Sequence, residues 1–196
     1  FAHEVRTHPM AVHNRVGKVP YFSVTKTFTG EHGHSVDQAT YTAVSCEKPE
    51  DFTREGYRMQ AGQNGVVGGC VAMVVVTMYN EGYEELELTL KGICDNLYHL
   101  CKVEGEETWK EFCVCIVSDG VEKANKETLE YGEQMGFFDE KLMKEHSHDI
   151  DVQMHLFEIT TQNFQATYNP LQIMFALKQH NAGKLNSHLW FFNAFA

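Results

Sequence analysis

Apolar residues gather in short unbroken runs along the chain, and each run ends abruptly in polar residues. The clearest run, residues 71–78, is rich in β-branched side chains and leads into Tyr79, Asn80 and Glu81. Such a run between turn signals predicts a strand buried on both faces, as in a parallel sheet. Residues 112–118 form a second run of this kind and predict another buried strand, which ends at Asp119.

A helical pattern separates these two runs. Leucine and isoleucine recur at alternating spacings of four and three from Leu86 to Leu100, which places them on one face of a helix. Strand, helix and strand together predict a βαβ unit whose strands are parallel. The sequence therefore predicts an α/β fold with a parallel-centred sheet. It also places Glu81 and Asp119 at the carboxyl edge of that sheet, where open α/β sheets bind ligands.

The flanking segments give weaker patterns. In chain order we expect strands at 19–28, 41–46 and 152–159, a turn at 30–33, a loop or helix start at 49–53, a helix at 122–135 closed by Gly136, a helical turn at 139–145, and a buried helix or docking segment at 189–195. Pro170 should begin a further helix, because its missing N–H costs nothing in a first turn. The glycine-rich stretch 62–69 precedes a strand and lacks a following Gly-Lys-Ser/Thr, so it predicts a flexible entry to that strand and no phosphate loop.

Composition narrows the classes of partner. The chain has 196 residues and is 43% hydrophobic, which predicts one folded domain, and its net charge of −11 argues against a general nucleic-acid or anionic-lipid surface. The six cysteines form no Cys-x-x-Cys pair, which predicts reduced, buried thiols in a cytosolic domain. The histidines show no ligand spacing that would predict a metal site. Since the chain starts at Phe1 and ends in an aromatic-rich run, we expect it to be a piece of a longer protein.

Three polar clusters should converge at the sheet edge, at residues 77–81, 118–120 and 184–188. Carboxylates of Glu81 and Asp119 can accept hydrogen bonds from a uracil N–H or from ribose hydroxyls, and Lys184 can offset the charge of a diphosphate. The pattern therefore fits a nucleotide ligand. Two simpler interpretations stay open, in which Asp119 caps the following helix and Lys184 is a solvated cation at a helix end.

Several segments at these positions closely resemble the chitin synthases, which are processive family-2 glycosyltransferases with a GT-A catalytic domain. They are Val-Thr-Met-Tyr-Asn-Glu (76–81), Cys-Ile-Val-Ser-Asp-Gly (115–120), Met-Phe-Ala-Leu-Lys (174–178) and Asn-Ser-His-Leu-Trp-Phe-Phe-Asn-Ala-Phe (186–195). Residues 41–46 and 51–57 also resemble the segment that precedes the catalytic domain in this family. The last of the four motifs is the most specific.

The resemblance implies transfer of N-acetylglucosamine from UDP-N-acetylglucosamine to a growing β-1,4-linked chitin chain, with Mg²⁺ or Mn²⁺ as cofactor. Carried over position by position, it implies that the donor is bound by Thr77, Tyr79 and Glu81 at the base and ribose, Asp119 at the uracil, and Lys184 and Asn186 beside the diphosphate. It further implies an N-terminal extension at 1–65 and the first half of a truncated, Rossmann-like GT-A domain at 66–196.

By the same resemblance, the catalytic base, the metal ligands and the translocating helices are expected beyond Ala196, so that this piece alone should be inactive. The implied partners are the chitin chain and the rest of a membrane-embedded, homodimeric synthase at the cytoplasmic face of the plasma membrane, where it would serve cell wall biogenesis. Two alternatives stay open: another processive family-2 synthase of the hyaluronan or cellulose type, or a non-catalytic interaction module on the same fold.

Overall fold

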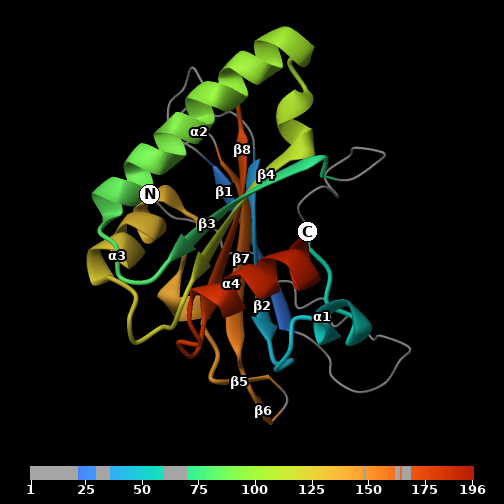
Figure 1. The fold of residues 1–196 in the computed structure, drawn as a ribbon, viewed down its shortest axis with the longest axis vertical. Coiled ribbons are helices and arrows are strands. Elements are labelled where there is room, and N and C mark those ends of the chain that lie inside the picture. Colours follow the sequence, from blue (N-terminus) through green and yellow to red (C-terminus); the bar gives the residue numbers. More distant parts are fainter. Residues whose placement is uncertain (1–21, 30–35, 60–69, 148, 162–163, 165–168) are drawn as a thin grey trace.

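A six-stranded sheet forms the centre of the protein (Figure 1) in the computed structural model, which describes residues 22–29, 36–59, 70–147, 149–161, 164 and 169–196. In sheet order the strands are β1 (Phe22–Thr29), β2 (Val36–Val44), β7 (Met154–Thr161), β8 (Leu171–Lys178), β4 (Phe112–Ser118) and β3 (Ala72–Met78). A small separate pair is formed by β5 (His146–Ser147) and β6 (Ile150–Asp151).

The sheet is parallel on one side and antiparallel on the other. β3, β4 and β8 run parallel, whereas β8 with β7, β7 with β2, and β2 with β1 are antiparallel pairs. The predicted βαβ unit is confirmed, since α2 (Tyr83–Glu104) connects the parallel strands β3 and β4. The carboxyl ends of β3, β4 and β8 therefore meet at one edge, and the antiparallel pairs bring the end of β2 and the start of β7 to the same edge.

The segment after Pro170 is a strand, so the predicted helix is wrong. β8 lies between β7 and β4, and all eight of its residues are buried. A central strand covered on both faces is largely apolar, and a short apolar run has no period that distinguishes it from a buried helix. Pro170 precedes the strand, where its missing N–H removes no bond from the ladder.

β3 is also less buried than its sequence predicts. It is the last strand in the described sheet, and its residues from Met73 to Thr77 are only half-buried. The prediction of burial on both faces is therefore wrong for β3, and β8 is the strand that fits it.

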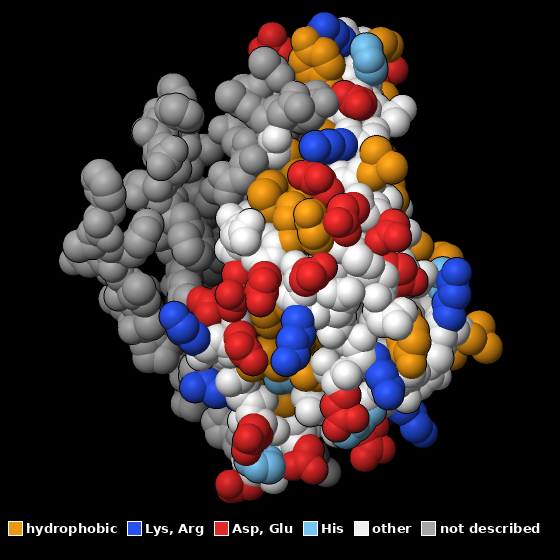
Figure 2. All heavy atoms as spheres, turned by 90° about the vertical axis from the view of Figure 1, so that its left-hand side faces the viewer, with side chains coloured by type: hydrophobic (Ala, Val, Ile, Leu, Met, Phe, Trp, Pro, Cys, Tyr) orange, Lys and Arg blue, Asp and Glu red, His pale blue; other side chains and the backbone are white. Residues whose placement is uncertain are grey.

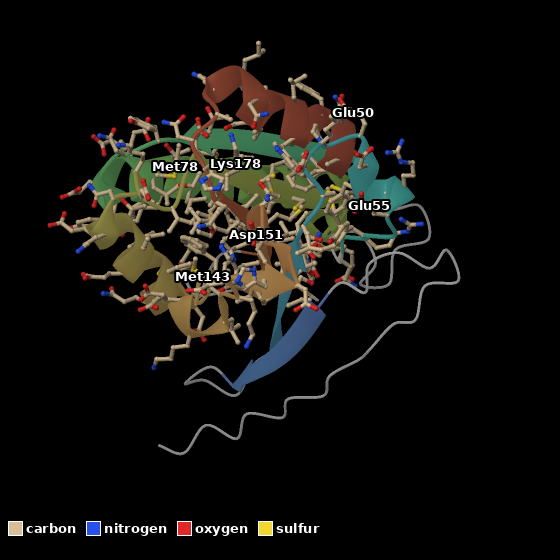
Figure 3. All side chains as sticks on the ribbon, turned by 90° about the horizontal axis from the view of Figure 1, so that it is seen from below. Glu50, Glu55, Met78, Met143, Asp151 and Lys178 are labelled. Atoms are coloured by element: carbon tan, nitrogen blue, oxygen red, sulfur yellow. The ribbon has the colours of Figure 1, made fainter. Side chains whose placement is uncertain are left out.

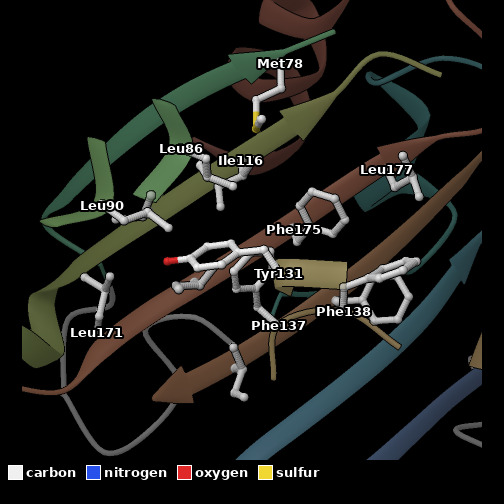
Figure 4. Close-up of a cluster of buried hydrophobic side chains, with 14 of the residues drawn as sticks. Met78, Leu86, Leu90, Ile116, Tyr131, Phe137, Phe138, Leu171, Phe175 and Leu177 are labelled. Atoms are coloured by element: carbon white, nitrogen blue, oxygen red, sulfur yellow. The ribbon is translucent and has the colours of Figure 1, made fainter. Parts of the chain in front are cut away.

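Helices cover both faces of the sheet and make it the middle of three layers (Figure 1). One face packs against α2 and α3 (Lys126–Met135), and this core includes Leu86, Leu90, Ile116 and Phe175 (Figure 4). The other face packs against α1 (Asp51–Arg54), α4 (Lys184–Trp190) and the π-helical turn Phe191–Phe195. The side chains of β4 contribute in turn to one core and then the other, because successive side chains of a strand point to opposite faces.

Several shorter predictions can be compared with the structure. α3 begins at Lys126, later than predicted, because Asn125 caps it by accepting from the backbone N–H of Glu127 at 2.9 Å. Gly136 ends the same helix with φ +84°, as predicted. The expected helical turn is present at Glu140–Leu142, and a further 3-10 turn spans Thr108–Glu111.

The strands expected at 19–28, 41–46 and 152–159 are confirmed with shifted ends as β1, β2 and β7. Both N-terminal strands join the same sheet as the rest of the chain. The predicted turn at 30–33, the glycine-rich stretch 62–69 and the predicted division at 65/66 lie outside the described residues. All six cysteines are free and five are buried, whereas Cys70 is half-buried.

In the described part of the chain, no helix combines the length and the apolar character needed to cross a lipid bilayer.

Candidate functional site

A cavity of about 270 Å³ lies at the carboxyl edge of the parallel strands. Its lining consists of Thr77, Met78, Tyr79, Glu81, Asp119, Asn181, Gly183, Lys184 and Ser187. Five of the six predicted site residues are thus brought together. The volume is below the range of about 300–1,000 Å³ typical of small-molecule sites, so the cavity can enclose part of a nucleotide sugar while the remainder extends beyond it.

The register of the parallel strands explains why these side chains meet at one edge. The parallel register pairs Met78 with Ser118, which places the next residues, Tyr79 and Asp119, level with each other. β8 is paired to β4 so that Ser118 lies opposite Leu177, and Lys178 is therefore level with Asp119. Figure 3 views this edge of the sheet and shows Met78 beside Lys178. Helix α4 follows the loop after β8 and closes this side of the cavity.

Asp119 is the most firmly held acid of the site. It is 4% exposed, and its Oδ1 accepts hydrogen bonds from Lys178 Nζ at 2.6 Å and from the backbone N–H of Ala182 at 3.0 Å. Among the described residues we find no hydrogen bond to Oδ2 of Asp119, so this second oxygen is the one available to a ligand in the cavity. The alternative that Asp119 caps the next helix is wrong, because Asn125 fills that role.

Lys178 is a candidate site residue that the sequence interpretation misses. Its side chain is 4% exposed, and Nζ lies 3.5 Å from Ser187 Oγ on α4 as well as against Asp119. A buried charge is tolerated when it is paired and hydrogen-bonded. The available signal is a lysine directly after the apolar run 173–177, and it identifies a strand-end cation only once β8 is known to be a strand.

The remaining charges of the cavity are exposed. Glu81 accepts a hydrogen bond from the backbone N–H of Tyr79 through its side chain, and its backbone carbonyl accepts one from Thr128 Oγ1 at 2.9 Å. Lys184 is the first residue of α4, where a cation does not complement the helix dipole. The carboxylates of Glu81 and Asp119 are matched by the ammonium groups of Lys178 and Lys184. The local charge therefore cancels, and a diphosphate is not repelled.

Gly120 allows the two loops of the site to approach closely. It has φ +105°, and a Cβ at this position would lie 2.9 Å from the backbone nitrogen of Asn181. The backbone N–H of Val121 also donates to the carbonyl of Lys178 at 2.9 Å. The loop after β4 is therefore fastened to the loop after β8, which carries Ala182 to Asp119.

Asn186, the sixth predicted site residue, does not line the cavity. It lies on α4 directly before Ser187, which does line it, and one residue along a helix turns a side chain by about 100°. Its Oδ1 is buried with no hydrogen-bond partner in the described structure. The predicted contact of Asn186 with a diphosphate stays a prediction.

The cavity does not by itself fit a divalent metal ion. Within the described ranges, no group of three or more His, Cys, Asp or Glu side chains is arranged to hold one. The cavity supplies two carboxylates, and that of Asp119 is already neutralised by Lys178.

The wider surface is acidic. On the face formed by α2 and α3, acidic side chains are spread across the middle of the molecule (Figure 2). This distribution agrees with the net charge of −11 and disfavours contact with polyanionic partners there.

Comparison with known proteins gives one consistent family. A model of the chitin synthase-like glycosyltransferase domain matches residues 72–196. Chitin synthase 1 of Phytophthora sojae is 40% identical over an alignment of 171 residues that covers 80% of this chain and 18% of the relative. Chitin synthase 2 of Cryptococcus neoformans is 37% identical, covering 82% of this chain and 18% of the relative. Chitin synthase 1 of Gibberella zeae is 35% identical, covering 79% and 19%. The chain thus spans about a fifth of the length of these relatives.

Proposed function

The chain belongs to the family of chitin synthase-like glycosyltransferases, and we propose that it forms the donor-nucleotide half of a chitin synthase active site. The ligand would be UDP-N-acetylglucosamine. The observation that carries this proposal is the cavity at the carboxyl edge of β3, β4 and β8, where Tyr79, Glu81, Asp119 and Lys184 meet.

Each side chain would have a distinct role in holding the donor. Oδ2 of Asp119 would accept the uracil N–H, in a charge-assisted hydrogen bond that Lys178 orients by holding Oδ1. Glu81 would accept from the ribose hydroxyls, with Thr77 and Tyr79 beside the base. Lys184 is the exposed cation of the cavity and would lie against the diphosphate.

In the proposed reaction, the 4-hydroxyl of the chitin chain attacks the anomeric carbon of the donor sugar. The bond to UDP breaks with inversion, and the hydroxyl proton passes to a base. We place this base, the Mg²⁺ or Mn²⁺ ligands and the translocating helices in the part of the protein beyond Ala196. The chain alone would then bind donor without transferring it, and sugar transfer by residues 1–196 alone would contradict this division.

The cellular setting is also a proposal. A chitin synthase of this kind would be a membrane-embedded homodimer at the cytoplasmic face of the plasma membrane. In the full-length protein, turnover of UDP-N-acetylglucosamine should exceed turnover of UDP-glucose. The reverse preference would indicate a cellulose-type synthase.

Calorimetric titration with UDP tests the site directly. We expect the wild-type full-length protein to bind UDP, and Asp119→Ala to weaken binding by about 1.5–3 kcal/mol, the usual contribution of a hydrogen bond to a charged group. Glu106→Ala is a matched control, because it removes an exposed acid at the opposite edge of the sheet and should leave the affinity unchanged. A wild-type protein without affinity for UDP would favour the non-catalytic interaction module.

A further inference from the structure

A second cavity, of about 450 Å³, lies behind the donor cavity at the same edge of the sheet. It is lined by Val121, Glu140, Met143, Lys144, Glu145, Asp151, Val152, His155, Gln179 and His180. Figure 3 labels Met143 and Asp151 from this cavity, below Met78 and Lys178 in the view. The end of β8 contributes to both sides, because Lys178 pairs with Asp119 of the first cavity and the next residue, Gln179, lines the second.

A chain of hydrogen bonds crosses the wall of this second cavity. The backbone N–H of Lys144 donates to Tyr41 Oη at 3.1 Å. Tyr41 Oη lies 3.0 Å from His155 Nδ1, and His155 Nε2 lies 2.9 Å from Gln179 Oε1. The network assigns the tautomer: Tyr41 gives its hydroxyl hydrogen to Nδ1, and a neutral imidazole with its proton on Nε2 donates to Gln179.

The same network reaches the donor cavity through the backbone. The backbone N–H of Gln179 donates to the carbonyl of Gln153, the residue before β7, at 2.8 Å. The side chain of Gln179 is held by His155 on β7. Its neighbour Lys178 pairs with Asp119, and four residues after Lys178 the N–H of Ala182 donates to the same carboxylate. The segment 179–183 is thus anchored at one end by His155 and at the other by Asp119.

We propose that neutral His155 is a positioning residue for the donor cavity: by holding Gln179, it keeps residues 179–183 in the geometry that clamps Asp119. Its partner Tyr41 lies on β2, ahead of the family-matched residues 72–196, so a strand outside the matched domain helps to shape the site. The ligand in this inference rests on the proposed function, whereas the geometry does not.

Protonation should release the anchor. A proton on Nδ1 turns this acceptor into a donor, and the buried Tyr41 hydroxyl then loses the acceptor for its hydrogen. Burial lowers the pKa of His155, which favours the neutral form that the network requires. The charged and titratable groups that share the cavity are Glu140, Lys144, Glu145, Asp151 and His180, of which Asp151 pairs with His146 at 2.8 Å.

The test uses His155→Phe in the full-length protein, because phenylalanine keeps an aromatic ring beside Tyr41 but can make neither hydrogen bond. Binding of UDP-N-acetylglucosamine is measured by calorimetry from about pH 7.5 to about pH 5.5, a range that spans the usual histidine pKa. Hydrogen exchange of the Ala182 amide is followed without ligand. We expect about five-fold or greater loss of affinity and about ten-fold faster exchange at Ala182. The decline of wild-type affinity toward low pH should disappear in the variant.

Two further variants sharpen the result. Tyr41→Phe removes only the hydroxyl and should reproduce the faster exchange. His180→Gln changes a histidine of the same cavity for which no hydrogen bond is found among the described residues, and it should behave as wild type. Donor binding with unchanged affinity, pH profile and Ala182 exchange in His155→Phe would overturn the positioning role. A wild-type protein that binds no donor, while His155→Phe still exchanges faster at Ala182, would instead overturn only the proposed function.

Discussion

Lys178→Met should destabilise the protein strongly, because it leaves the Asp119 carboxylate buried without its cation. The lysine and aspartate side chains are 4% and 6% exposed, and Nζ and Oδ1 are 2.6 Å apart. After the substitution, Oδ1 of Asp119 still accepts the hydrogen bond from the backbone N–H of Ala182 at 3.0 Å, but it has lost the bond from the lysine. Breaking a buried ion pair from one side typically costs about 3–5 kcal/mol.

The reverse change gives a loss of similar size. Asp119→Asn leaves a buried ammonium group without its counter-charge, because the amide oxygen of asparagine can accept a hydrogen bond but carries no net charge. Ser187 Oγ, at 3.5 Å, is a neutral oxygen as well. The double variant contains neither charge, and replacing a whole buried pair by neutral groups is often close to neutral in stability. The two single losses should therefore sum to about 6–10 kcal/mol, whereas the double variant should lose no more than about 2 kcal/mol.

Urea unfolding of the 196-residue chain, followed by circular dichroism, measures all four proteins of this cycle. The exposed pair Lys110–Glu107 is the matched control, since Lys110→Met with Glu107→Gln should change stability by less than about 1 kcal/mol. The double variant at the donor site should fold but bind UDP poorly. Additive losses at Lys178 and Asp119 would refute the reasoning, because they would mean that the two charges do not compensate each other.

Two further predictions test the loops around the site. Gly120→Ala should lower stability by about 1–3 kcal/mol and weaken UDP binding, because the new Cβ would lie 2.9 Å from a backbone nitrogen. Gly183→Ala is the control, since Gly183 has φ +85° but no atom within 4 Å of its Cβ, and it should lose less stability in the same urea titration. Equal losses in the two variants would contradict the steric account. The pKa of His155 is lowered in the folded state, so the unfolded chain binds more protons than the folded chain once the pH falls below about 6.5. The free energy of unfolding should therefore decrease as the pH falls below this value, and this pH dependence should flatten in His155→Phe. An unchanged slope in that variant would assign the dependence to other groups.

The sequence predicts the parts of the fold that follow from local pattern. β-branched runs identify β3 and β4, the leucine spacing identifies α2, and together they place Glu81 and Asp119 at one edge of the sheet. Parallel pairing with a helical crossover leaves one arrangement for such a unit, which is why this part can be inferred from local pattern alone.

The missed features depend on contacts between distant segments. Residues 173–177 are apolar because both sides of β8 are covered, and only the neighbours β4 and β7 reveal that it is a strand. Lys178 escapes prediction for the same reason, since its pairing with Asp119 follows from the register of β8 against β4. The resemblance places Asn186 at the cavity, whereas the turn of α4 gives that position to Ser187.

The pairing of Asp119 with a lysine 59 residues later has a consequence for synthesis on the ribosome. The strands β3 and β4 emerge before β8, so their acidic edge lacks its counter-charge until β8 has left the exit tunnel. Strand β2 must likewise wait for β7, with Tyr41 and His155 separated by 114 positions. Because such distant pairings fold slowly, the nascent chain should expose an unfinished sheet for much of its translation, and the nucleotide crevice should be among the last features to form.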